Sequence, residues 1–395
     1  MQPDRDLMEE ALRHLSAIER PSASEGERVA AEWIAASLRE LGAEARIEVE
    51  RAHGTFWWPL GLLNVVSLIG AALGRTAGRV LAAAAFATLV DDLDHRSRWF
   101  RRAFLPRRRT WNVIAETGDP EAARTVVVVA HHDAAHGGAI FDTRAIAAFA
   151  RRFPKLHERA NRWPPLMWAV VLGPLLVALG RRRAGAGLSV GVLAALADVA
   201  RSPVAPGAND NLSAVAAVLA LARALRDEPV RGLRVLLVST GSEESLSEGM
   251  QAFGERHFPA LPRESTTVVA LECLGSGRLA VPESEGFLLP HFYDGALKDL
   301  ATECARRAGI DVVRGLHVVF ASDAQIAVHA GYPTMLLGGI DDLKLPAHYH
   351  KPTDLPENIQ MDCLADAVHV LDALVRELAA DQDRASSERA TASAS

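Results

Sequence analysis

The sequence predicts an α/β protein: a mixed, mostly parallel sheet covered by helices on both faces, plus an inserted apolar helical lobe. Apolar strands such as TVVVVA (125–130) and RVLLVST (234–240) alternate with segments of helical spacing such as ANDNLSAVAAVLALARAL (208–225). This alternation is typical of helix-covered, mostly parallel sheets. Two long apolar segments, which begin near residues 56 and 163, interrupt it and predict the lobe.

The composition narrows the class of protein. The chain has 395 residues, of which 49% are hydrophobic, and its net charge is −6. With no long basic run, nucleic acid is not expected as the main partner. The three cysteines, Cys273, Cys304 and Cys363, are widely spaced and predict no disulfide framework, which fits a reducing compartment. The charged, amphipathic N-terminus lacks the features of a secretory signal. We therefore expect the protein on the cytoplasmic side, with membrane association through the apolar segments left open.

The regular elements follow from periodicity along the chain. Helices are predicted at 5–19, 25–41, 208–225, 297–309 and 357–380 from their apolar spacing. Strands are predicted at 44–50, 111–116, 125–130, 234–240, 266–274 and 333–339. The polar, low-complexity segment 381–395 is expected to be disordered.

Acids and histidines follow the predicted strands at the ends where parallel sheets bind ligands. They are His131, His132 and Asp133 after the strand at 125, Glu243 and Glu244 after the strand at 234, Glu272 after the strand at 266, His348, His350 and Asp354 after the last strand, and Asp210 at a helix start. A single carboxylate there could simply cap the next helix. Five such positions on one rim are better explained by a metal site, because buried unpaired acids repel one another.

The ordered motifs resemble those of the di-zinc aminopeptidases of peptidase clan MH, family M28. The motifs are AHHD (130–133), GANDN (207–211), SEES (242–245), LECLG (271–275) and YHKPTD (349–354). The resemblance implies a zinc-exopeptidase, phosphorylase/hydrolase-like fold, in a discontinuous catalytic domain made of 1–51, 109–136 and 206–380. The segments 52–108 and 137–205 are then apolar helical insertions.

By this resemblance the chain would hold two Zn²⁺ ions. Asp210 would bridge both ions, and Glu243 would be the general base that takes a proton from the water between them. The implied ligands are His131 and Glu272 for one ion, Glu244 and His350 for the other, and Asp210 for both. Asp133 and Asp354 would each accept the second ring N–H of the neighbouring histidine, and Asn211 follows the bridging residue as in the family.

The sequence departs from the family at several points. Glu272 stands where the family usually has aspartate, and its side chain reaches one methylene further. Ala324 stands where a histidine is expected, and SLSEGM follows Glu244 in place of the usual Gly-Ser pair. No ligand role is expected for His132, His136 or His348.

Three functions remain open on this reading. The first is a zinc metallopeptidase, an aminopeptidase-like exopeptidase that hydrolyses N-terminal peptide bonds. The second is a single-zinc glutaminyl cyclase or small-amide deacylase. The third is a catalytically retired, membrane-associated interaction protein. The expected partner of the first two is a peptide or small amide.

The apolar insertions also allow two interpretations. The longer runs, near 56–74 and 163–180, would extend about 27 Å at 1.5 Å per residue, close to a bilayer core. The returning runs, 80–90 and 184–197, are shorter. Tryptophans near the ends and flanking arginines suit a membrane interface. A soluble lobe whose helices pack together, or against a second subunit through 56–90 and 163–197, is the alternative.

Overall fold

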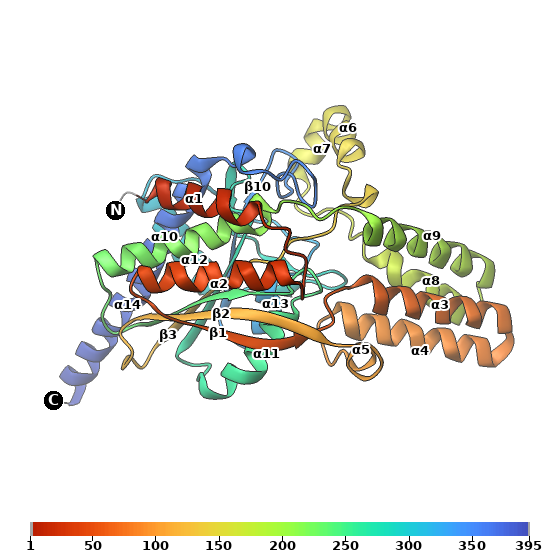
Figure 1. Cartoon of the computed structure of the whole chain (residues 1–395), viewed down its shortest axis with the longest axis horizontal. Coiled ribbons are helices and arrows are strands. Elements are labelled where there is room, and N and C mark those ends of the chain that lie inside the picture. The colour runs from red at the N-terminus through yellow and green to blue at the C-terminus, as the bar shows by residue number, and fades with distance from the viewer. Residues whose placement is uncertain (1–2, 394–395) are drawn as a thin grey trace.

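The fold is built on one eight-stranded mixed sheet (Figure 1). This computed structural model describes the backbone of residues 3–393 and the side chains of residues 3–380. The strand order is β1 (Glu44–Ala52), β2 (Arg108–Gly118), β4 (Arg234–Thr240), β3 (Thr125–His131), β5 (Thr266–Glu272), β10 (Thr334–Ile340), β6 (Arg278–Ala280) and β9 (Val312–Val313). The central strands β4, β3, β5 and β10 run parallel. The pairs β1–β2, β2–β4 and β10–β6 are antiparallel, and β9 runs parallel to β6. The predicted fold class is confirmed.

The middle strand β3 shows why the sheet is covered on both faces. Its four consecutive valines are β-branched and suit a pleated strand, and every residue of β3 is buried. Val126 and Val128 pack into one apolar core, whereas Val127 and Val129 pack into another on the opposite face. A strand with both faces buried lies in the centre of the sheet. His131 is the last residue of β3 and so lies at the carboxyl end of this central strand.

Helices form the two outer layers. The larger core is covered by α1 (Arg5–Ser16), α2 (Glu25–Glu40), α10 (Ser213–Asp227), α12 (Gly295–Arg307) and α14 (Met361–Ser393). The opposite face is covered by α11 (Glu248–His257) and α13 (Asp323–His329). The helix α14 continues into the segment 381–395 that was expected to be disordered. The side chains of that segment, and all of residues 394–395, lie outside the described part of the chain.

The apolar insertions form four helices that pack together and project from one end of the sheet (Figure 1). They are α3 (Trp57–Leu73), α4 (Arg75–Leu93), α8 (Trp168–Ala178) and α9 (Arg182–Arg201). We call this bundle the lobe. Its inner apolar cluster also includes Leu246 and Leu288 of the part that contains the sheet, so the base of the lobe lies next to the loop that carries Glu243 and Glu244.

Short elements complete the chain. Near the lobe they are α5 (Trp99–Phe104), η1 (Ala139–Phe141), α6 (Arg144–Arg152) and α7 (Pro154–Arg159). The others are η2 (Ala208–Leu212), η3 (Phe258–Ala260), η4 (Pro356–Asn358) and a two-stranded sheet of β7 (Ser284–Glu285) and β8 (His291–Phe292).

Candidate metal centre

Asp210 lies between two histidines beyond the carboxyl ends of the parallel strands. Its Oδ1 atom is 3.4 Å from Nε2 of His131, and its Oδ2 atom is 3.2 Å from Nε2 of His350. The two oxygens of this one carboxylate therefore lie next to two different imidazole rings. This is the arrangement that a residue bridging two cations requires.

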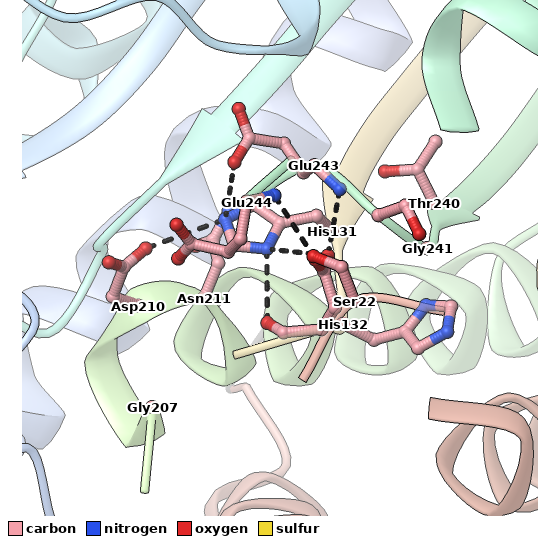
Figure 2. Close-up of polar contacts among 12 residues, drawn as sticks. Ser22, His131, His132, Gly207, Asp210, Asn211, Thr240, Gly241, Glu243 and Glu244 are labelled. Atoms are coloured by element: carbon pink, nitrogen blue, oxygen red, sulfur yellow. Dashed lines mark hydrogen bonds and ion pairs between the residues drawn. The ribbon is translucent and has the colours of Figure 1, made fainter. Parts of the chain in front are cut away.

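Each histidine has further carboxylates beside it. Nε2 of His131 lies 3.7 Å from Oε2 of Glu272 and 3.8 Å from Oε2 of Glu243. Nε2 of His350 lies 3.3 Å from Oε2 of Glu244. Figure 2 shows His131, Asp210 and the adjacent Glu243 and Glu244 meeting from three separate segments of the chain. The structure thus brings all five expected ligands and the expected base into one cluster.

The loop that carries Asp210 is held by its backbone. Gly207, at φ +64°, turns the chain into η2, and a side chain there would meet the guanidinium of Arg20 at 2.6 Å. The carboxylate of Asp354 accepts hydrogen bonds from the backbone N–H groups of Asn209 and Asp210, at 2.7 and 3.1 Å. The loop is therefore fixed from outside, which leaves both oxygens of Asp210 to face the histidines.

Asn211 joins this loop to the strand end that carries Glu272. Its Nδ2 donates to the carbonyl of Leu271 at 2.8 Å, and its Oδ1 accepts from the N–H of Cys273 at 3.0 Å. These two bonds hold the backbone on both sides of Glu272. Asn211 therefore supports the position of a predicted ligand without facing the cluster.

Asp133 organises the opposite side of the site. Its two carboxylate oxygens accept from the N–H groups of Glu243 and Glu244, at 3.0 and 3.1 Å, and from the hydroxyl of Ser22 at 2.6 Å. Its Oδ1 also lies 3.5 Å from Nδ1 of His131. The Nδ1 atom of His131 lies closer to the backbone carbonyl of Asp133, at 3.3 Å, so Asp133 faces the second ring nitrogen with both groups rather than with its carboxylate alone. The carboxylate of Asp133 also holds the backbone of the two glutamates.

The expectation for Asp354 was wrong in its detail. Its carboxylate is occupied by the backbone of the Asp210 loop, and Nδ1 of His350 has no hydrogen-bond partner among the described residues. The ring of His350 is instead positioned by aromatic contacts. It stacks on Tyr349 at 3.9 Å between centroids and lies 4.3 Å from the ring of Phe141.

The electrostatics of the cluster favour a bound cation. Burial raises the pKa of Glu243 well above its usual range and raises that of Glu272 to about 7, although His131 opposes both shifts. Burial lowers the pKa of His350, but Glu244 and Asp210 outweigh it and raise the value to about 10. A site with more buried acids than bases holds protons unless a cation neutralises it.

Unsatisfied atoms point to the same conclusion. Oδ2 of Asp210, Oε1 of Glu244 and both ring nitrogens of His350 are buried without a hydrogen-bond partner in the described part of the chain. Suitable ligand atoms of His131, Asp210 and Glu244 all lie within 4.8 Å of one another, as do those of Asp210, Glu272 and Cys273. Imidazole nitrogens and carboxylate oxygens are zinc ligands, so the residues present fit such ions.

Three supporting residues near the N-terminus were not anticipated. Arg20 is fully buried and donates to the carbonyls of His132, Pro206 and Gly207, which ties the end of β3 to the Asp210 loop. Ser22 donates to Asp133, as described above. Glu27 accepts from the backbone N–H and hydroxyl of Ser242, both at 3.1 Å. The only sequence signal was the Ser-x-x-Glu pattern at 24–27, which marks a helix start.

The remaining histidines lie outside the cluster, as expected. His132 is buried with Nδ1 2.9 Å from the hydroxyl of Ser239, and burial lowers its pKa to about 3. The Nδ1 atom of His136 lies 2.8 Å from the carbonyl of Ser202. That of His348 lies 2.8 Å from the hydroxyl of Thr353.

The sheet is that of the zinc-exopeptidase fold, and the acids and histidines at the ends of its strands form a candidate metal centre. The sequence model of Peptidase family M28 matches residues 189–375, so the resemblance to this family is confirmed. A search of curated protein sequences found no match.

Solved structures show the same fold at low sequence identity. The chain is similar to an aminopeptidase from Aneurinibacillus sp. strain AM-1 (14% identity, TM-score 0.58, 96% of this chain and 94% of that one). It is equally similar to a leucine aminopeptidase precursor from Bacteroides thetaiotaomicron (13%, 0.58, 95% and 98%). A glutaminyl cyclase from Porphyromonas gingivalis also matches (13%, 0.56, 95% and 98%). Aminopeptidases and glutaminyl cyclases therefore share this fold, so the fold does not distinguish the two activities.

Proposed function

We propose that the protein is an exopeptidase that uses two zinc ions to hydrolyse N-terminal peptide bonds. The observation that carries the proposal is the placement of Asp210, whose two oxygens face His131 and His350 separately. Glu272 and Glu244 then complete two separate ligand sets. A single ion would need only one of these sets.

The roles of the side chains follow from their positions. When bound, the two ions would lower the pKa of a water molecule and polarise the carbonyl of the peptide. Glu243 shares the pocket but contributes no expected ligand atom, and its raised pKa suits a group that takes and returns a proton. It would accept the proton of the attacking water and deliver it to the leaving amine. Asp133 would keep Glu243 and Glu244 in these separate roles.

A cyclase that uses one zinc ion is the second candidate. The match to a glutaminyl cyclase structure supports it, and so does Glu272, because the altered reach at this position would change one of the two ligand sets. The two proposals differ in the number of ions bound per chain. They also differ in product, since a cyclase releases ammonia from an N-terminal glutamine and leaves the peptide chain intact.

The Glu243→Gln variant tests the peptidase proposal. Gln keeps the shape of the side chain but cannot accept a proton, so hydrolysis of aminoacyl p-nitroanilides should fall by about 10²–10⁴-fold while bound zinc is unchanged. Glu255→Gln, a change of an exposed acid in α11, is the matched control and should keep full activity. Undiminished hydrolysis by Glu243→Gln would contradict the role of Glu243.

A further inference from the structure

The outward face of α3 is a continuous apolar stripe. Trp58, Leu62, Val65, Ile69 and Leu73 follow one another at intervals of three or four residues, so they share one face of the helix. Their exposed fractions lie between 37% and 62%. The two polar side chains of the same helix, Asn64 and Ser67, are fully buried inside the lobe.

The contacts between the helices of the lobe are made by small residues. A Cβ atom on Gly78 would lie 2.1 Å from the carbonyl oxygen of Gly70, where α3 and α4 meet. A Cβ atom on Gly173 would lie 2.4 Å from Oγ of Ser189, where α8 meets α9. Meanwhile Val80 on α4 and Val190 on α9 are exposed by 63% and 55%.

The outside of the lobe differs from that of a water-soluble bundle. A soluble bundle exposes polar side chains, whereas the lobe exposes valine, leucine and tryptophan, and it buries asparagine, serine and glycine among the leucines and valines of its interior. Close contacts through small residues, with polar groups inside and large apolar groups outside, are typical of helices packed within lipid. One helix, Arg182–Arg201, is long and apolar enough to cross a membrane, and only 28% of its apolar window is buried.

Charges are confined to the two ends of the lobe. The sequence has no charged residue from Trp57 to Gly74 or from Trp163 to Gly180. Arginines gather at the far tip, at positions 75, 79 and 181–183. Two of them link the hairpins there, since Arg182 donates to the carbonyl of Ala71 and Arg79 donates to that of Ala178.

We propose that the lobe crosses a lipid bilayer as a four-helix bundle, with the arginines of its tip among the far headgroups. Five arginines at the centre of a bilayer would be very costly, so an inserted lobe must emerge on the other side. The 17 residues of α3 span about 26 Å, a little less than a bilayer core of about 30 Å, and arginine side chains and local thinning can absorb this difference. The 11 residues of α8 span only about 17 Å, so α8 does not cross the core by itself but packs against the three longer helices. The candidate metal centre then lies close to the membrane surface, because Leu246 packs in the base of the lobe.

Contact with acyl chains can be measured without any assay of catalysis. Full-length Ile69→Trp and Val49→Trp proteins are reconstituted into phosphatidylcholine–phosphatidylglycerol vesicles whose acyl chains carry bromine, which quenches tryptophan on contact. The two sites are similarly exposed, by 48% and 53%, but Val49 lies on β1 of the catalytic part. The fluorescence added by Ile69→Trp should be mostly lost, and that added by Val49→Trp should persist. Equal fluorescence from both would overturn the proposal.

Flotation of the same vesicles gives a second readout. Val65→Lys places a charge on the outward face of α3 and should lower the ratio of bound to free protein by on the order of a hundredfold. Val29→Lys on α2 is the matched control, since the native valines are exposed by 37% and 40%, and it should float like the native protein. Circular dichroism in detergent checks that both variants fold. A native protein that stays out of vesicles and forms a dimer in plain buffer would show that a second copy covers the lobe instead, and would overturn the proposal.

Discussion

Glu243 and Glu244 are neighbours in the chain but face different histidines. Oε2 of Glu243 lies 3.8 Å from Nε2 of His131, and Oε2 of Glu244 lies 3.3 Å from Nε2 of His350. The backbone N–H groups of both glutamates donate to the one carboxylate of Asp133. The buried carboxylate of Asp133 therefore fixes the backbone from which Glu243, the proposed base, and Glu244, a proposed ligand, point in different directions.

The Asp133→Asn variant should weaken the whole site. The asparagine amide can accept one of these backbone bonds but presents a donor to the other, and it loses the charge beside Nδ1 of His131. Metal affinity should fall by about 10–100-fold, the usual effect of losing a partner that orients a ligand. Competition with a zinc-binding dye measures this affinity. Ser22→Ala, which removes only the hydroxyl bonded to Asp133, should cost much less, and equal effects of the two changes would contradict the central role of the carboxylate.

Two adjacent arginines should differ sharply in their effect on stability. The Arg101 guanidinium is buried against Asp92 at 2.7 and 2.8 Å and donates to the carbonyl of Ser245. Arg101→Met leaves the Asp92 carboxylate buried and unpaired, so the free energy of unfolding should fall by about 3–5 kcal/mol. Arg102→Met breaks only an exposed pair with Glu255 and should cost about 0–1 kcal/mol.

Urea unfolding of both variants in mild detergent provides the comparison. The paired design cancels the effects of removing one positive charge and adding one methionine. Similar losses in the two variants would show that the buried pair does not anchor the base of the lobe to the loop after Glu244.

The stability of the protein should depend on the titration of Glu285. Burial raises the pKa of this carboxyl to about 8, against opposing hydrogen bonds from Ser322. Because the folded state holds this proton more tightly than the unfolded state, the free energy of unfolding should fall as pH rises from about 4.5 to 8. The slope from one group is at most about 1.4 kcal/mol per pH unit. Glu285→Gln should remove this contribution to the pH dependence of the free energy of unfolding. The variant should therefore become more stable relative to the native protein near pH 8.

Glu283 supplies the control, two residues away. Lys298 and Arg314 hold its pKa at about 2 despite partial burial, so it stays charged throughout the same range. Glu283→Gln should therefore leave the slope between pH about 5 and 8 unchanged, as followed by urea unfolding. A slope that persists in Glu285→Gln would show that another group carries it.

Candidate ligands could be found from sequence because parallel strands align their carboxyl ends, whereas the choice among neighbouring acids and histidines was implied by the resemblance to family M28. His131, Glu244 and Glu272 each follow a recognisable buried strand, so their convergence depends only on strand order. The residues that fix their orientation could not be found in this way. Arg20 meets the carbonyl of His132 across 112 positions, through contacts that no local pattern encodes. The partner of Asp354 was misjudged because proximity in sequence suggested the ring of His350, whereas the fold places the Asp210 loop closer.

For the lobe, the sequence predicted the helices but not how they pack. Its four helices were evident from the apolar runs, but periodicity gave no indication of which face was buried. The positions of Asn64 and Ser67 inside, and of Val65 and Ile69 outside, appear only when the helices are packed together.

The most direct test of the account is the zinc content of the purified protein and of its Asp210→Ala variant, measured by elemental analysis after zinc is supplied and the excess removed. If Asp210 bridges two ions, the native protein holds close to two zinc ions per chain and the variant loses most of both. One ion per chain would favour the cyclase. No bound zinc in the native protein would contradict the proposed metal centre altogether.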